Sequence, residues 1–219
     1  MTSSDLGAFG EAGDTLARIA ASGRISPSYL FEGADGEVLR EAATAFASVL
    51  LGGQAEGHPD YHVLEKDKPT VISVAALAEE LERAHQTPLQ GARQVFVIDP
   101  AEAMEPEGVA RYLKALEEPP EGTTYLLVST SPERLPATVL SRVRRVRLPP
   151  MGDAAIQRRL ESDGLDPERA ARLARWGSGS LARARRVATY ELDVVVERLL
   201  EAAHGKTGAA LAAEAAQSA

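Results

Sequence analysis

A short segment near the N-terminus combines an apolar run, a turn that holds Gly33 and Gly36, and an amphipathic helix. A phosphate-binding loop of this form has the pattern Gly-x-x-x-x-Gly-Lys-Ser/Thr, whose amides and lysine surround the phosphates while the hydroxyl holds magnesium. Counted from Gly33, Val38 replaces the second glycine. Leu39 replaces the lysine and Arg40 the hydroxyl residue. Leucine cannot neutralise a phosphate and arginine cannot hold magnesium, so the residues predict a degenerate loop with no nucleotide cofactor.

A second candidate for nucleotide chemistry is Asp99, which follows the apolar run 95–98. An acidic residue at the end of a buried strand beside a phosphate loop orients magnesium, and a glutamate after it activates water. Pro100 stands in the position of that glutamate, so the catalytic acid is absent. Asp99 can instead cap the turn before the next helix, and the degenerate loop favours this interpretation.

Other combinations of reactive side chains are weaker. His58 and His62 are four residues apart, but Pro59 disfavours the helix that would align them and no further ligands accompany them, so we expect no metal site. The chain has no cysteine, which excludes disulfides, thiolate zinc sites and cysteine nucleophiles. No serine–histidine–acid spacing is specific enough to indicate a hydrolase.

The elements that must position these residues follow from hydrophobic periodicity. The segment from Tyr29 to Phe46 predicts a strand, a turn and a helix. Continuous apolar runs suit strands buried on both faces of a parallel sheet, and we expect them at residues 61–64, 71–72, 95–98, 125–128 and 146–148. Helical patterns lie between them at residues 37–51, 74–85 and 106–116. This alternation predicts an α/β sandwich with a mostly parallel sheet.

After Pro149 and Pro150 the pattern changes to short helices, predicted at residues 154–161, 167–175 and 180–187. We therefore expect three parts: a nucleotide-fold domain at 1–149, a small helical lid at 150–189, and the start of a further helical domain at 190–219. A helix is expected from residue 190 to 203, and the alanine-rich tail from residue 205 is expected to be partly disordered.

Composition and charge narrow the function classes. The chain has 219 residues, is 44% hydrophobic and carries a formal charge of −8. No apolar stretch is long enough to cross a membrane and no signal peptide is evident, so we expect a cytoplasmic protein without membrane contact. Residues 134–190 hold 13 arginines against 5 acidic residues. Such a block suits nucleic acid or an acidic partner, but charge alone favours a solvated surface.

Several short stretches occur in an order that is more specific than any one of them. They are His58-Pro59-Asp60, Val97-Ile98-Asp99, Leu113–Pro120 with its LEEPP sequence, Ser129-Thr130-Ser131, Ser141-Arg142-Val143 and Gly179–Arg183. In this order they resemble the delta-prime family of subunits of the bacterial DNA polymerase III clamp loader, which are AAA+ proteins. The resemblance runs from Tyr29 to about Ala184.

The resemblance implies an AAA+ (P-loop NTPase-like) parallel-sheet sandwich followed by a helical lid. Together with Leu39 and Pro100, it implies a subunit that neither binds nor hydrolyses ATP, within a complex that loads the sliding clamp onto primed DNA. It identifies Arg142 as an arginine finger that acts in trans on the ATP site of a neighbouring subunit. Arg183 would be the arginine of the second sensor.

The partners implied are the ATPase subunits of the gamma/tau type and the delta subunit, with the sliding clamp reached indirectly. The resemblance also allows contact with primer–template DNA. It implies that the protein acts in the cytoplasm, at the replisome on the nucleoid. Val143 replaces a cysteine of the family motif without affecting its arginine. The full family architecture would also include a helical collar, which only residues 190–203 could begin.

The sequence is also compatible with two other classes of function. One is a working ATPase with an unorthodox phosphate loop, which ATP turnover by the isolated chain would reveal. The other is a DNA-binding module that uses the basic segment 134–190, whose affinity would fall steeply with salt. Within that segment, Arg142 is followed by Arg144, Arg145 and Arg147 at near-alternating positions, so some of these side chains must face solvent or a partner. For Arg144 and Arg147 we favour a solvated strand edge.

Overall fold

The computed structural model describes residues 6–196 and 198–200. The chain divides into two compact units, one ending at Pro150 and the other beginning at Met151. Residues 201–219, which hold the end of the predicted last helix and the alanine-rich tail, lie outside the described residues. Within the described ranges, no helix is both long and apolar enough to cross a membrane.

The first unit is built on a five-stranded sheet in the order β2-β3-β4-β1-β5. Every neighbouring pair of strands is parallel, which confirms the predicted parallel sheet. The strands are β1 (Ser28–Glu32), β2 (Tyr61–Leu64), β3 (Gln94–Ile98), β4 (Thr123–Ser129) and β5 (Arg144–Arg147). Every residue of β1, β3 and β4 is buried, as expected for central strands that are covered on both faces.

The prediction of a strand at residues 71–72 is wrong. Ile72 forms only an isolated bridge with Met104. Its amide donates to the carbonyl oxygen of Ala103, and its own carbonyl accepts from the amide of Glu105. Ile72 is therefore held to the loop before α5 and not to the sheet, and Ser73 directly after it already caps the next helix.

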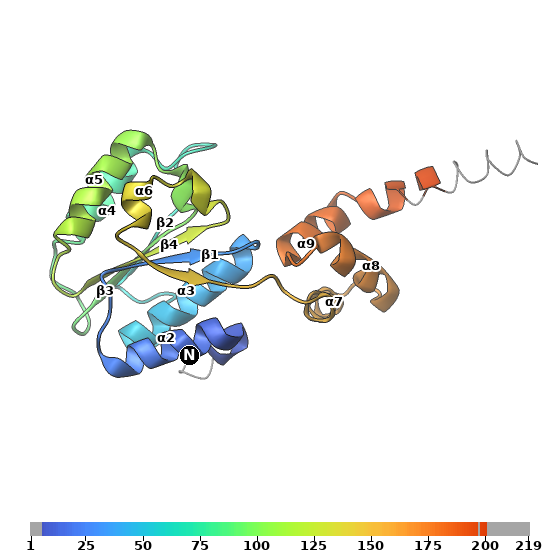
Figure 1. Cartoon of the computed structure of the whole chain (residues 1–219), viewed down its shortest axis with the longest axis horizontal. Coiled ribbons are helices and arrows are strands. Elements are labelled where there is room, and N and C mark those ends of the chain that lie inside the picture. Colours follow the sequence, from blue (N-terminus) through green and yellow to red (C-terminus); the bar gives the residue numbers. More distant parts are fainter. Residues whose placement is uncertain (1–5, 197, 201–219) are drawn as a thin grey trace, which may run out of the picture. The chain divides into compact units, whose positions relative to one another are not determined.

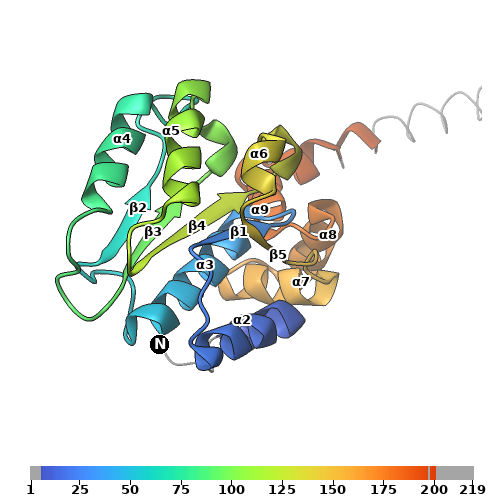
Figure 2. The same cartoon turned by 60° about the vertical axis from the view of Figure 1, so that its left-hand side comes forward.

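Helices cover both faces of the sheet (Figures 1 and 2). On one face lie α2 (Gly10–Ser22) and α3 (Gly36–Leu51). On the other lie α4 (Val74–Arg83), α5 (Pro106–Glu117) and the short α6 (Ala137–Leu140). The longer helices predicted between the strands are confirmed, whereas the sequence did not indicate α2. Single-turn 3-10 helices lie at Gly7–Phe9 (η1), Ala101–Ala103 (η2) and Pro132–Arg134 (η3).

Local sequence explains where these helices begin and end. The Ser73 hydroxyl accepts from the amide of Ala76 at the start of α4. Pro106 opens α5, where its missing N–H removes no helical hydrogen bond. Gly52 ends α3 in a left-handed conformation with φ of 74°, which glycine adopts at low cost.

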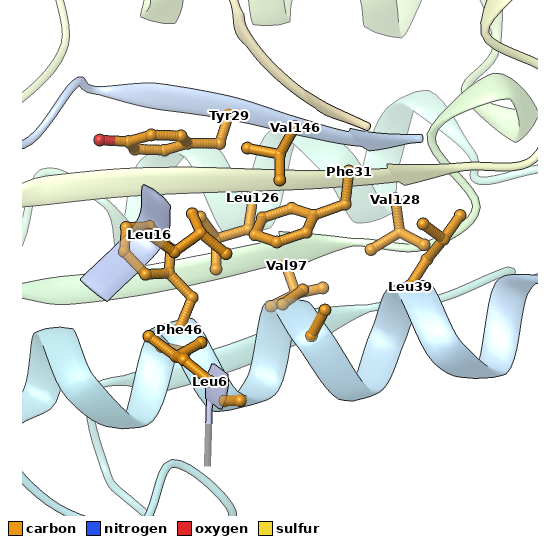
Figure 3. Close-up of a cluster of buried hydrophobic side chains, with 14 of the residues drawn as sticks. Leu6, Leu16, Tyr29, Phe31, Leu39, Phe46, Val97, Leu126, Val128 and Val146 are labelled. Carbon is orange, nitrogen blue, oxygen red and sulfur yellow. The ribbon is translucent and has the colours of Figure 1, made fainter. Parts of the chain in front are cut away.

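Each face of the sheet has its own hydrophobic core. Figure 3 shows the one between the sheet and α3, where Phe46 meets Tyr29 and Phe31 at ring-centroid distances of 5.0 and 6.3 Å. On the opposite face Tyr112 packs edge-on against Tyr125 at 5.4 Å and shares a hydrogen bond with the Ser28 hydroxyl. Burial raises the pKa of Tyr112, and raises that of Tyr125 to about 12.

The second unit contains the helices α7 (Asp153–Ser162), α8 (Pro167–Gly177) and α9 (Leu181–Thr189), close to the predicted ranges. Their small core is formed by alanines and by Ile156, Leu160, Leu173 and Leu181. Beyond α9, the buried carboxylate of Asp193 accepts from Arg169 Nε at 2.8 Å, which ties the start of the following segment to α8.

The His58-Pro59-Asp60 stretch organises a loop beside the sheet. The buried Asp60 carboxylate accepts hydrogen bonds from the amides of Leu89 and Gln90, both at 2.6 Å. His58 Nδ1 accepts from the amide of Asp60 at 3.1 Å. The stretch therefore fixes the path of the chain between α4 and β3.

Truncating Phe46 tests the first core. We expect Phe46→Ala to lower the free energy of unfolding by about 3–5 kcal/mol, because it removes a fully buried ring between α3 and β1. Urea unfolding followed by circular dichroism measures the change. Phe46→Leu keeps most of the apolar volume and should cost about 1–2 kcal/mol. Equal losses for both variants would contradict the packing described for this ring.

Removing the Asp60 carboxylate tests the loop. We expect Asp60→Ala to lower the free energy of unfolding by about 1–3 kcal/mol, because two amides lose a charged acceptor. Hydrogen exchange at Leu89 and Gln90 should accelerate, whereas Asp60→Asn, which keeps one acceptor oxygen, should give an intermediate rate. Unchanged exchange at both amides would show that other contacts hold the loop.

Candidate functional site

The predicted phosphate loop lies where β1 meets α3, at the carboxyl edge of the sheet. Asp35 caps α3, and its Oδ1 accepts from the amides of Glu37 at 3.0 Å and Val38 at 3.2 Å. Free amides at a helix N-terminus are the groups that bind phosphate in a working loop. Here a carboxylate of the chain itself accepts from two of them.

Leu39, which stands in the position of the phosphate-binding lysine, is buried in the core beneath the loop (Figure 3). The nearby Gly33 has a packing reason to be glycine. A Cβ atom at Gly33 would lie 2.8 Å from the carbonyl oxygen of Leu148 and 3.3 Å from Leu39 Cδ2. The backbone after β5 therefore approaches the loop closely, and this contact alone explains the glycine.

Arg40 and Asp99 meet at this edge of the sheet. Arg40 Nε donates to Asp99 Oδ2 at 2.5 Å, and Arg40 Nη1 lies 3.0 Å from Glu65 Oε1. The Asp99 side chain is only 7% exposed. Burial raises the pKa of Asp99, although the Arg40 guanidinium acts in the opposite direction.

This geometry corrects the expectation that Asp99 caps a turn. The 3-10 helix after Pro100 begins without a side-chain cap, and the Asp99 carboxylate is directed to Arg40. The prediction failed because the partner of Asp99 lies 59 positions earlier in the chain, on a different element. In working P-loop enzymes the hydroxyl and the acidic residue at these two positions hold magnesium.

The stretch Ser129-Thr130-Ser131 also reaches the loop. A Cβ atom at Gly36 would lie 3.6 Å from Thr130 Cγ2, so the two residues are neighbours. Thr130 Oγ1 donates to Glu102 Oε1 at 3.4 Å. The structure thus brings the loop, the end of β3 and the end of β4 together.

Arg142 follows α6, and its side chain is 38% exposed. Its Nη2 donates to Glu117 Oε1 at 2.8 Å, and its Nη1 donates to the carbonyl oxygen of Thr138 at 3.1 Å. Glu117 belongs to the LEEPP stretch at the end of α5. Two stretches that the sequence singled out separately are therefore in direct contact.

The basic segment 134–190 is divided between the two units at Pro150. In the first unit, Arg145 and Arg147 both donate to the buried carboxylate of Glu32. In the second unit, Arg185 pairs with Asp163 at 2.9 Å. Arg183, the predicted second-sensor residue, lies exposed on α9.

Sequence reasoning missed three acidic residues that pair with arginines of the first unit. Glu65 pairs with Arg40, Glu117 pairs with Arg142, and Glu32 pairs with both Arg145 and Arg147. Each of them is brought to its arginine by tertiary structure, and no local spacing indicates the pairing. Among the described residues, no group of three or more histidine or acidic side chains is arranged to hold a metal ion.

Comparison with known proteins gives the family. The family described as "DNA polymerase III, delta subunit" matches residues 10–152. DNA polymerase III subunit delta' of Bacillus subtilis is 31% identical over 169 residues, which cover 69% of this chain and 50% of that protein. The delta' subunit of Pseudomonas aeruginosa is 41% identical over 101 residues, covering 45% of this chain and 30% of that protein. The chain thus spans half or less of the length of these relatives.

Solved structures give the fold. A DNA polymerase III gamma subunit-related protein of Thermotoga maritima superposes with a TM-score of 0.57 at 21% identity, over 74% of this chain and 57% of that one. The RuvB Holliday junction branch migration motor of the same organism gives 0.56 at 17% identity, over 85% and 62%. The parallel sheet, the matching family and the delta' relatives agree, and the chain belongs to the delta-prime family of DNA polymerase III clamp-loader subunits, with the AAA+ fold.

Proposed function

We propose that this chain is a clamp-loader subunit that neither binds nor hydrolyses ATP. The observation that carries the proposal is the Arg40–Asp99 ion pair, which occupies the two positions that hold magnesium in a working enzyme. A metal-bound nucleotide would have to break this pair and leave the buried Asp99 beside a displaced guanidinium. The hydrogen bonds from the first amides of α3 to Asp35 also disfavour nucleotide binding, because a phosphate would have to displace the Asp35 carboxylate.

We further propose that Arg142 serves a neighbouring ATPase subunit as an arginine finger. Its guanidinium is accessible, and it donates hydrogen bonds to an exposed carboxylate, a backbone carbonyl and a hydroxyl. An exposed ion pair such as Arg142–Glu117 contributes about 0–1 kcal/mol, so a phosphate can replace Glu117 at small cost. An arginine finger accelerates phosphoryl transfer by about 10³–10⁵-fold in known systems.

The partners of this function would be ATPase subunits of the gamma/tau type and the delta subunit. The relatives include DNA polymerase III subunit tau of Escherichia coli, 28% identical over 67% of this chain and 25% of that protein. Such an assembly would reach the sliding clamp through its other subunits and would act at the replisome in the cytoplasm, on primer–template DNA. Residues 150–189 would form the lid, and residue 190 onward would begin a collar.

Titration with Mg-ATP tests the silent site. We expect no heat of binding from this chain at high micromolar Mg-ATP, because Arg40 and Asp35 hold the positions of the metal and of the phosphate. A gamma/tau-type subunit titrated under the same conditions is the positive control. Saturable binding by this chain would contradict the proposal and favour a working ATPase.

The variant Leu39→Lys sharpens this test. A lysine alone should not create binding, because the Arg40–Asp99 pair and the Asp35 contacts persist. Tight binding of Mg-ATP by this single variant would show that the loop was silent only for lack of the lysine, and that the ion pair is no obstacle.

Replacing Arg142 tests the proposed finger in the reconstituted clamp loader. We expect Arg142→Ala to lower ATP turnover at the neighbouring site by about 10³-fold or more, with assembly unchanged. Arg134→Ala, at another exposed arginine close in sequence, is the matched control and should leave turnover unchanged. Normal turnover in an intact Arg142→Ala complex would rule out the proposed role.

A further inference from the structure

A groove of about 440 Å³ runs between α2 and the edge strand β5. Its helix side is lined by Phe9, Ala12 and Ile19, and its strand side by Arg144, Val146 and Arg147. β5 pairs with β1 on one side only and forms the end of the sheet (Figure 2). We call this feature the β5 groove.

The free edge of β5 offers backbone groups for a further strand. The amide of Leu148 donates to the carbonyl oxygen of Glu32 at 2.9 Å, so the residues in phase with Leu148 bond to β1. Backbone groups alternate in direction along a strand. The N–H and C=O groups of Arg145 and Arg147 therefore point away from β1, toward the open side.

Side chains of β5 are basic on both faces of the sheet. Arg144 pairs in register with Tyr29, whose ring lies in the core under α2 and α3, so Arg144 and Val146 lie on that face. Arg145 and Arg147 lie on the opposite face, where both contact Glu32. The Arg147 side chain stays 78% exposed.

This charge decides which strands can add to the edge. A second copy of β5 would place arginine against arginine, and like charges on adjacent strands repel. Arginine on an edge strand protects against unselective pairing in this way. A segment with acidic side chains instead meets opposite charge, while its apolar side chains can enter the groove beside Phe9 and Val146.

We propose that the β5 groove binds an extended segment of a partner protein in which acidic and apolar residues alternate, added to β5 as a sixth strand. Main-chain hydrogen bonds to Arg145 and Arg147 would supply affinity, and the alternation would supply specificity. The proposal is independent of the arginine finger and of the silent ATP site. It uses the edge of β5 that faces away from β1, and it involves neither Arg142 nor the Arg40–Asp99 pair.

The observations favour a peptide over nucleic acid. A nucleic acid backbone would use the arginines but neither the outward N–H and C=O groups nor the apolar lining. An extended polypeptide can use both features at once, because its backbone can pair with the free edge of β5 and its apolar side chains can enter the groove.

A fluorescein-labelled peptide of alternating glutamate and valine tests the proposal by fluorescence anisotropy with the intact chain. We expect saturable binding, about tenfold weaker for a peptide of the same composition with all glutamates first. Hydrogen exchange should slow at the amides of Arg145 and Arg147 on binding, but not at Val146, which bonds to β1 in the free chain.

Arg147→Glu reverses the exposed charge on the face where the acidic side chains of the peptide would lie, while Arg145 keeps both of its hydrogen bonds to Glu32, and it should weaken the peptide about tenfold. Arg134→Glu, an exposed arginine outside the groove lining, is the matched control and should bind like the unmodified chain. Equal binding of both peptides, or protection of amides elsewhere, would overturn the proposal. So would a single-stranded oligonucleotide that protects the β5 amides when the alternating peptide does not.

Discussion

A buried carboxylate at the end of a central strand needs a cation, and this requirement governs the candidate site. Asp99 follows β3 between neighbouring strands, where water screens its charge poorly. In a magnesium-dependent enzyme the metal would supply the positive charge. Here Arg40 supplies it from the first turns of α3, with Glu65 holding the other side of the guanidinium. Losing Arg40 would leave the buried Asp99 carboxylate without its donor, which costs on the order of 1–3 kcal/mol, whereas the half-exposed Arg40 would keep Glu65 if Asp99 were lost.

The parallel sheet makes that pairing possible. In parallel strands all carboxyl ends lie at one edge, so loops that are distant in sequence converge there. Arg40, Asp99 and Thr130 reach this edge from three different strand ends. The contact between Glu117 and Arg142 has a similar origin, since it joins the end of α5 to the turn before β5.

Much of the fold could be predicted from the sequence, because fully buried strands are continuous apolar runs and the helices between them are amphipathic. The strand expected at residues 71–72 failed since two apolar residues can be held by a loop as well as by a sheet. α2 was missed, and it contains two glycines that weaken a helical signal. Of the candidate site, the loss of lysine and glutamate was visible from residue types. The role of Asp99 was not, because it depends on which side chain of α3 faces the end of β3.

Leu39 has a consequence for how such a chain can change over generations. Its side chain is part of the core, so a lysine in its place would lose apolar contacts and bring an ammonium group to the edge of that core. It would gain no phosphate in return while Asp35 accepts from the amides of α3. A hydroxyl in place of Arg40 would likewise leave Asp99 without its counter-charge. Each of these single substitutions would therefore lower the stability of the fold before it could contribute to a magnesium-nucleotide site.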